Sequence, residues 1–185
     1  MFCFSVLYWT KQLREETAVK RLEVYYDYLC PYCYKGHQYL LPLVEKYPDL
    51  EIVWRPCEAN PRPEYSPVHS DLAIAGLYYL QDIGGDTDAY NELVYAAKHD
   101  HDQRLDDPFV LCGLAEMCGA DWEEFDKAIH SEEYAQRVRK ANEYAWNTLG
   151  WSAIPSYVCG KQGIGSEPGV LVTFEELDAF VAQAE

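Results

Sequence analysis

The sequence has few basic residues: 15 Lys and Arg stand against 31 Asp and Glu in 185 residues, giving a formal net charge of -16 at pH 7. A negative charge of this size repels nucleic-acid phosphates and anionic membrane surfaces over most of the molecule. The chain also lacks an uninterrupted apolar run of about 18 residues, the length that crosses a bilayer. We therefore expect neither nucleic acid nor a membrane among its partners.

The seven cysteines lack the arrangement of a secreted disulfide framework, because their number is odd and their spacing is irregular. This favours a reducing compartment and a cytoplasmic location. No basic residue precedes the apolar run that opens the chain, and no small-residue cleavage site follows it. We interpret residues 1–20 as an N-terminal extension of uncertain role, a mis-assigned start or a remnant of cloning. A signal peptide, an added edge strand and a partner-binding tail are the alternatives.

A chain of this length can form one domain with a real core, or one domain with a sizeable insertion. Its first third predicts a β-α-β unit. Residues 21–29 are rich in β-branched and aromatic side chains and predict a strand. Residues 31–46 place most of their apolar side chains on one face of a helix, and residues 51–56 return to a strand pattern.

Residues 61–149 predict an all-helical insertion, because helical signals recur there between turn residues. A block of this length is larger than any ordinary loop. The last helix is expected to run to Gly150. Each expected helix begins at a side chain that can cap it: Ser70 or Asp71, Asp107, Asp121 with Glu124, and Ser131.

Beyond the insertion, residues 156–160 and 163–165 predict two short paired strands, and Thr173 with Glu176 predicts the start of a final helix. The whole chain therefore predicts an α/β fold that runs β-α-β and then β-β-α. Residues 21–60 and 150–185 would form this fold, and residues 61–149 would form the insertion.

Cys30 and Cys33 stand in the stretch "YYDYLCPYCYKG", where the first predicted strand gives way to a helix. At the N-cap, the Cys30 sulfur faces free backbone amides, and Pro31 suits the first helical position because its missing amide would be unpaired there. The helix dipole then lowers the pKa of the Cys30 thiol. Cys33 lies one turn further on the same face, within reach of a disulfide. The pattern favours dithiol–disulfide exchange, with Cys30 as nucleophile and Cys33 as resolving thiol.

The same C-x-x-C spacing also occurs in zinc sites, and two nearby thiols can simply be buried. Zinc requires a second pair of ligands, which the chain does not supply cleanly. His99 and His101 lie in an acidic segment that we expect to be a solvated helix end, so no metal is predicted. Cys57 and Cys159 are expected to be small buried side chains. Cys112 and Cys118 are candidates for a second redox pair, although the five residues between them place them on different faces of a helix.

The chain resembles the DsbA family of thioredoxin-fold proteins in the order of four features: the cysteine motif, the helix and strand after it, the helical insertion and the later "GWSAIPSYV". The likeness extends from about Leu22 to the C-terminus and is greatest to the cytoplasmic FrnE-like branch. It implies a thioredoxin-like fold and a thiol–disulfide oxidoreductase that acts on protein or small-molecule thiols. It implies no cofactor beyond the cysteine pair, although glutathione is a candidate co-substrate. It also implies that Pro155 is a cis-proline facing the cysteines, and that the Ile154 backbone pairs with an extended substrate segment.

Tyr32 stands where DsbA itself has a histidine between its cysteines. We therefore expect Cys30 to be a less extreme thiolate and the protein to be a weaker oxidant. Tyr32, Pro31 and Trp151 are candidates for a substrate-contacting rim. Asp27 either relays a proton to and from Cys33 or is a solvated carboxylate at the strand end. His37 is expected at the surface, or as a donor at the edge of the core.

Two other functions are compatible with this pattern. The 2-hydroxychromene-2-carboxylate isomerases and kappa-class glutathione transferases share the insertion and bind glutathione, but they typically have serine at the position of Cys30. A glutathione-dependent isomerase or transferase is therefore the alternative function. The other candidate is an adaptor that binds a metal or a partner through the two cysteines. No oligomeric state is predicted.

Overall fold

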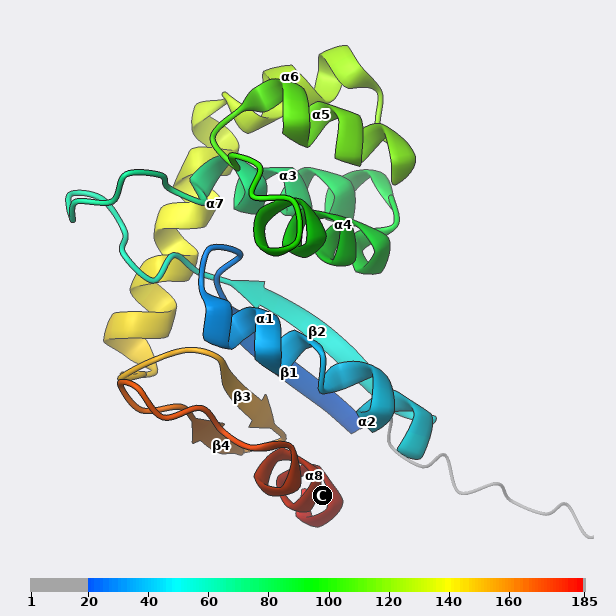
Figure 1. The fold of residues 1–185 in the computed structure, drawn as a ribbon, viewed down its shortest axis with the longest axis vertical. Helices are drawn as coiled ribbons and strands as arrows, with labels where there is room; N and C mark the ends of the chain where they lie inside the picture. Colours follow the sequence, from blue (N-terminus) through cyan, green and yellow to red (C-terminus); the bar gives the residue numbers. More distant parts are fainter. Residues whose placement is uncertain (1–19, 185) are drawn as a thin grey trace, which may run out of the picture.

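A computed structural model describes residues 20–184 and contains a four-stranded mixed sheet with the strand order β2-β1-β3-β4 (Figure 1). Strand β1 (Lys20–Tyr26) runs parallel to β2 (Leu50–Pro56). Strand β3 (Ser156–Cys159) runs antiparallel to β1, and β4 (Gln162–Gly165) runs antiparallel to β3. The predicted β-α-β and β-β-α order is therefore confirmed. The apolar run at the start of the chain lies outside the described residues.

The prediction of one helix over residues 31–46 was wrong, because the chain forms α1 (Pro31–His37) and α2 (Leu40–Lys46) instead. Pro42 accounts for the break. It has no amide to donate to the carbonyl of Gln38, and its ring clashes with that carbonyl in a continuous helix. Because of this break, α1 is a separate short helix that begins at the cysteine pair.

Residues 71–148, between β2 and β3, form a series of helices, as predicted, whereas residues 57–70 form none. Figure 1 shows most of these helices stacked beyond one end of the sheet. The sequence did not predict the bounds of α4. The last helix was predicted to run to Gly150, but its α-helical part ends at Glu143 and a π-helical turn follows. The elements are α3 (Asp71–Ile83), α4 (Thr87–His99), α5 (Pro108–Met117), α6 (Trp122–Ile129), α7 (Glu132–Glu143) and the π-helical turn η1 (Tyr144–Thr148).

Side-chain caps begin most of these helices. Asp107, Asp121 and Ser131 each accept hydrogen bonds from first-turn amides, as the sequence predicts. Ser70 precedes α3 but its side chain makes no capping bond. Gly84 ends α3 in the left-handed region at φ 70°, a conformation that costs glycine little.

The two faces of the sheet are covered differently. Val24 and Tyr26 point toward α1 and the insertion, where Tyr26 packs edge-on against Trp54 with ring centroids 5.6 Å apart. Helix α8 (Phe174–Gln183), begun by the predicted capping box of Thr173, packs beside α2, where Lys46 donates to Asp178 at 2.7 Å. Tyr25 points to the opposite face. The cysteine-bearing helix therefore lies on a helix-covered side of the sheet, where a cavity of about 500 Å³ remains between α1, α2, β2 and α4.

A buried hydrogen-bond network joins β1 to the insertion. The hydroxyls of Tyr26 and Tyr28 both donate to Oδ1 of Asn91 in α4, over 2.8 Å from Tyr28. The Asn91 side-chain amide in turn donates to the Thr87 carbonyl at 2.8 Å. The side chains of Tyr26, Tyr28 and Asn91 are each at most 1% exposed, so water cannot take the place of these hydrogen bonds. It holds the segment that carries Asp27 and Cys30 against α4. Within residues 20–184, no helix has the length and apolar character needed to cross a membrane.

Candidate active site

Cys30 is the N-cap of α1, as predicted, and Pro31 occupies the first helical position. The backbone of Cys30 is extended (φ -82°, ψ 117°), and its sulfur accepts a hydrogen bond from the Cys33 amide over 3.3 Å. Both cysteines are free thiols. Cys30 is partly exposed, whereas only 1% of Cys33 is exposed. The first turn of the helix therefore presents one sulfur to solvent and hides the other.

The two thiols also differ in acidity. Hydrogen bonds from the Cys33 thiol and from the amides of Cys33 and Tyr32 lower the pKa of the Cys30 thiol, although burial opposes them. Burial raises the pKa of the Cys33 thiol well above its usual value, and the neighbouring Cys30 adds to this shift. At neutral pH, Cys30 thus has the larger thiolate fraction, and thiolate is the reactive form.

The segment before β3 meets the cysteine pair. The Ile154–Pro155 peptide bond is cis, and the Ile154 carbonyl oxygen lies 3.8 Å from the Cys30 sulfur. A Cβ atom on Gly36 would lie 2.9 Å from Pro155 Cγ and 2.6 Å from the Tyr157 hydroxyl. Helix α1 can therefore approach Pro155 this closely only because residue 36 has no side chain. The Tyr157 hydroxyl, which the sequence did not single out, is buried without a hydrogen-bond partner.

Asp27 is buried between β1 and the segment that follows β2, with 2% of its surface exposed. Its Oδ1 accepts from the Leu29 amide at 2.9 Å, and its Oδ2 accepts from the Ala59 amide at 2.7 Å. Burial raises the pKa of the Asp27 carboxyl, although these two amides oppose the shift. The interpretation of Asp27 as a solvated carboxylate was therefore wrong, because the chain after β2 folds over it.

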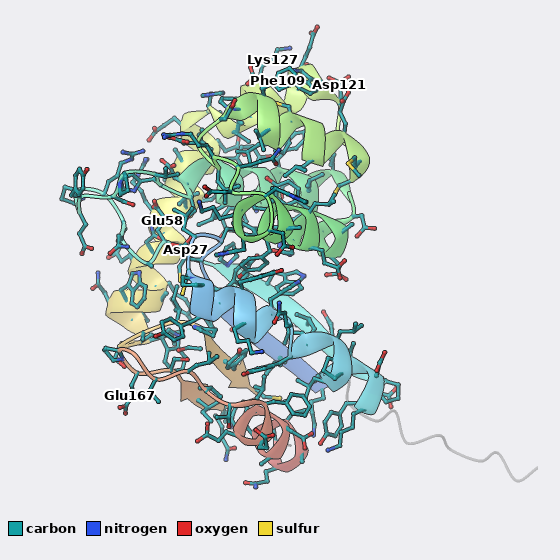
Figure 2. All side chains as sticks on the ribbon, in the orientation of Figure 1. Asp27, Glu58, Phe109, Asp121, Lys127 and Glu167 are labelled. Carbon is teal, nitrogen blue, oxygen red and sulfur yellow. The ribbon has the colours of Figure 1, made fainter. Side chains whose placement is uncertain are left out.

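Glu58, which no sequence motif singled out, is a second buried acid at the same end of the sheet (Figure 2). Its Oε1 lies 3.2 Å from Nδ1 of His69, and its Oε2 accepts from the Asn142 side chain at 2.8 Å. Burial raises the pKa of the Glu58 carboxyl. The available signal was topological: β1 and β2 are parallel, so the residues that follow each strand meet at one edge of the sheet.

These two acids line a cavity of about 350 Å³ that also touches Cys30 and Pro31. His69 and Ser70 form part of the same wall. The partly exposed thiol thus borders a polar hollow on one side and the Ile154 carbonyl on the other.

Residues 21–177 match the family described as "DSBA-like thioredoxin domain". The chain belongs to this family. Of the curated proteins, it is 25% identical over 183 residues to the uncharacterized protein YwbO of Bacillus subtilis (strain 168), covering 80% of this chain and 90% of that protein. The family expected from the two motifs is thereby confirmed.

Solved structures support the thioredoxin-like DsbA fold. A probable DsbA oxidoreductase from Streptomyces coelicolor is similar with a TM-score of 0.74 and 18% identity, and 89% of each chain is covered. A 2-hydroxychromene-2-carboxylate isomerase is similar with a TM-score of 0.64 and 18% identity, over 78% of this chain and 88% of the other. At these identities the likeness shows the fold alone, which oxidoreductases and an isomerase share.

The candidate rim residues of this DsbA-like chain lie in different surroundings. Tyr32 is 46% exposed on the first turn of α1. Trp151 packs over β4, where Cβ atoms on Gly163 and Gly165 would lie 2.8 and 3.0 Å from its ring. Tyr32 is therefore free to meet a partner, whereas the Trp151 ring is mainly held by the sheet.

Two histidines of the DsbA-like fold are half-buried at the edge of the core. His37 packs against Tyr95 with ring centroids 4.8 Å apart, and its buried Nδ1 has no hydrogen-bond partner. Burial lowers the pKa of His37 to about 4. His99 ends α4 as predicted, but it is not a solvated residue: its ring stacks on Tyr34 at 4.7 Å and its Nε2 lies 2.8 Å from the Tyr28 carbonyl oxygen.

The other cysteines of the described chain are all buried free thiols: Cys57 and Cys159, as predicted, and also Cys112 and Cys118. Burial raises the pKa of each of these thiols, which makes them less reactive than Cys30. Over residues 20–184, no three His, Cys, Asp or Glu side chains are grouped so that they could hold a metal ion.

Proposed function

We propose that this protein is a dithiol–disulfide oxidoreductase that exchanges disulfides with protein or small-molecule thiols through Cys30 and Cys33. The observation that carries the proposal is the asymmetry of the pair. A partly exposed sulfur of lowered pKa stands beside a buried sulfur of raised pKa, in the first turn of one helix. Such a pair can attack a partner and then release it.

In the reducing direction, the Cys30 thiolate attacks one sulfur of a substrate disulfide and forms a mixed disulfide. The first substrate thiolate leaves and takes a proton from solvent. The Cys33 thiol then loses its proton, for which we propose buried Asp27 as the acceptor, and attacks the Cys30 sulfur. The second substrate thiolate leaves, the Cys30–Cys33 disulfide forms, and two electrons have passed to the substrate. The same steps in reverse oxidise a dithiol, so the relative reduction potentials set the direction.

The cis-proline segment offers a binding surface for the partner. We infer that an extended substrate pairs with the backbone of Ile154, whose carbonyl oxygen lies 3.8 Å from Cys30. Pro155 shapes this surface, while Tyr32 and Pro31 contact the partner from the other side of the sulfur. Trp151 is assigned to the same rim, with its ring anchored on β4.

The exchange cycle requires no cofactor beyond the cysteine pair, and glutathione is a candidate co-substrate. We assign the protein to the FrnE-like branch and to the cytoplasm, because its cysteine spacing favours a reducing compartment. In such a compartment a low reduction potential is useful. Tyr32, which replaces the histidine of DsbA itself, fits a weaker oxidant.

A glutathione-dependent isomerase or transferase is the second candidate, because a 2-hydroxychromene-2-carboxylate isomerase shares the fold. The two cysteines at the start of α1 make this candidate less favoured, because such enzymes typically have serine at the position of Cys30. Glutathione-dependent isomerisation or conjugation that persists in Cys33→Ser would favour this candidate over ours. Stoichiometric zinc bound through both cysteines would instead favour the adaptor.

The decisive experiment is the equilibrium reduction potential of the Cys30–Cys33 pair in defined glutathione buffers, with alkylation and mass analysis to identify the cysteines that change state. We expect a reversible disulfide between these two residues, with a potential more negative than the roughly -120 mV of DsbA. A protein that forms no Cys30–Cys33 disulfide in any buffer would contradict the proposal.

A further inference from the structure

The cavity beside Cys30 has a polar wall that the exchange chemistry does not explain. Its volume is about 350 Å³, and it extends from Cys30 and Pro31 to the loop that leads into α3. Asp27 could serve the proton transfer proposed above. Glu58, on the same wall, contacts neither cysteine, so its presence there requires another reason.

The charges on this wall do not balance. Asp27 and Glu58 are carboxyls, and among the described residues that line the cavity the only side chain able to carry a positive charge is His69. The Nδ1 of His69 lies 3.2 Å from Glu58 Oε1, and the same histidine is the one lining side chain whose positive charge also acts on Asp27. Burial raises the pKa of both carboxyls, as expected where a compensating cation is lacking.

A second feature of the wall points to a missing partner. The Ser70 hydroxyl is buried without a hydrogen-bond partner, although it lies near enough to the Asp27 carboxyl to help lower its pKa, and only 1% of Ser70 is exposed. A buried hydroxyl without a partner is uncommon and costs stability. It is explained if a ligand in the cavity supplies the missing hydrogen bond.

Both carboxyls retain acceptor capacity. A carboxylate offers about four acceptor positions, and Asp27 and Glu58 each use two of them on groups of the chain. An ammonium group has three donors and one positive charge. It would match the unused acceptors, the Ser70 hydroxyl and the unbalanced charge together.

We propose that the cavity beside Cys30 is a subsite for the ammonium group of an aminothiol, and that small disulfides of such thiols are preferred substrates. This inference rests on the proposed oxidoreductase function. Cys30 attacks the substrate disulfide, one aminothiol leaves, and the other stays bound as a mixed disulfide with its ammonium group in the cavity. Cys33 then attacks Cys30 and releases it, so that the reduced protein supplies both electrons.

The test compares three small disulfides of opposite and zero charge: cystamine, hydroxyethyl disulfide and dithiodiglycolate. Reduced protein is mixed with each, and the first appearance of the Cys30–Cys33 disulfide is followed by acid quench, alkylation and mass analysis. Each rate is divided by the rate of the same disulfide with 2-mercaptoethanol, a neutral thiol, to remove intrinsic reactivity. The measurements use about 0.5 M sodium chloride, because the Debye length is then only about 4 Å and the general field of the acidic protein is screened.

We expect cystamine to react about tenfold faster than hydroxyethyl disulfide after this correction, and dithiodiglycolate to react slowest, since a partly buried charge is screened little by salt. Glu58→Gln should remove most of the preference for cystamine and leave the rate of the neutral disulfide within about twofold. Ser70→Ala, which keeps both carboxyls, should lower the cystamine rate alone.

Glu143→Gln is the matched control, because it removes the same charge from an exposed position of α7. Equal corrected rates for cystamine and hydroxyethyl disulfide would overturn the inference, as would equal effects of Glu58→Gln and Glu143→Gln. The neutral disulfide distinguishes failure of the oxidoreductase function from failure of the ammonium subsite. If reduced protein does not react with it, the proposed function fails, whereas reaction without charge preference defeats only the ammonium subsite.

Discussion

The backbone amide of Cys33 lies 3.3 Å from the sulfur of Cys30 and donates a hydrogen bond to it. The amide of the buried cysteine therefore stabilises the thiolate of the exposed one. Because Cys33 itself is enclosed, its own thiol gains no such help from solvent. The opposite acidities of the two thiols are a consequence of one helical turn.

Alkylation should show this asymmetry directly. In the reduced, folded protein we expect iodoacetamide to label Cys30 and to leave Cys33 unmodified, because only the accessible thiolate reacts. The rate at Cys30 should rise with pH around a midpoint below that of an ordinary cysteine. Peptide mapping after timed labelling measures both rates, and denatured protein is the control in which both cysteines react. Equal labelling of the two in the folded state would contradict the assignment.

Asp27→Asn should slow the release step more than the attack step. The carboxyl is buried with a raised pKa, so it can exchange a proton with Cys33, and an amide cannot. We expect resolution of the mixed disulfide to slow by about 10- to 100-fold, the usual contribution of a positioned acid or base. Quenched-flow analysis of the mixed disulfide separates the two rates. An unchanged lifetime of that intermediate would exclude Asp27 as the relay.

Gly36→Ala should disturb the junction between α1 and the cis-proline segment. The new methyl group would meet the Tyr157 hydroxyl and the Pro155 ring, and such overpacking typically costs about 1–3 kcal/mol. Gly113→Ala in α5 is the matched control, since its nearest neighbour would be 3.9 Å away, in ordinary contact. Urea unfolding measures both free energies of unfolding.

The same junction offers a rescue experiment. Adding Tyr157→Phe to Gly36→Ala removes the closest of the two clashes together with a hydroxyl that has no partner. The double variant should therefore be more stable than Gly36→Ala alone. If Tyr157→Phe is as destabilising in that background as in the wild-type chain, the proposed contact is not the cause.

Stability should fall in mild acid because of His37. Its pKa is about 4 in the folded protein, against an ordinary value of about 6.5, so the unfolded chain binds a proton first as the pH falls. The free energy of unfolding therefore falls as the pH drops below about 6.5, by about 2 kcal/mol between pH 7 and pH 5. Urea unfolding at both pH values should show this loss in the wild-type chain and a smaller loss in His37→Phe. An equal pH dependence in both proteins would contradict a buried neutral imidazole.

Local sequence signals located the cysteine pair well, because capping and spacing are properties of a few adjacent residues. Cys30 at the N-cap, Pro31 behind it and Cys33 one turn on are all as predicted. The same local reasoning failed at Pro42, where a continuous apolar face hid the break between α1 and α2. An apolar pattern indicates which face is buried, but it does not show whether the helix is continuous.

The sequence by itself thus determined the order of the strands, the DsbA-like family and the place of Cys30 and Cys33 at the start of a helix, since each depends on short-range pattern. Only the tertiary structure decided what surrounds them. Glu58 and Ser70 carry no motif, and they reach the neighbourhood of Cys30 because two parallel strands end at one edge of the sheet and the following loop folds back over it. The burial of Asp27 and of the His37 Nδ1 arises in the same way, because burial is set by distant segments that pack on a residue and not by its neighbours in the chain.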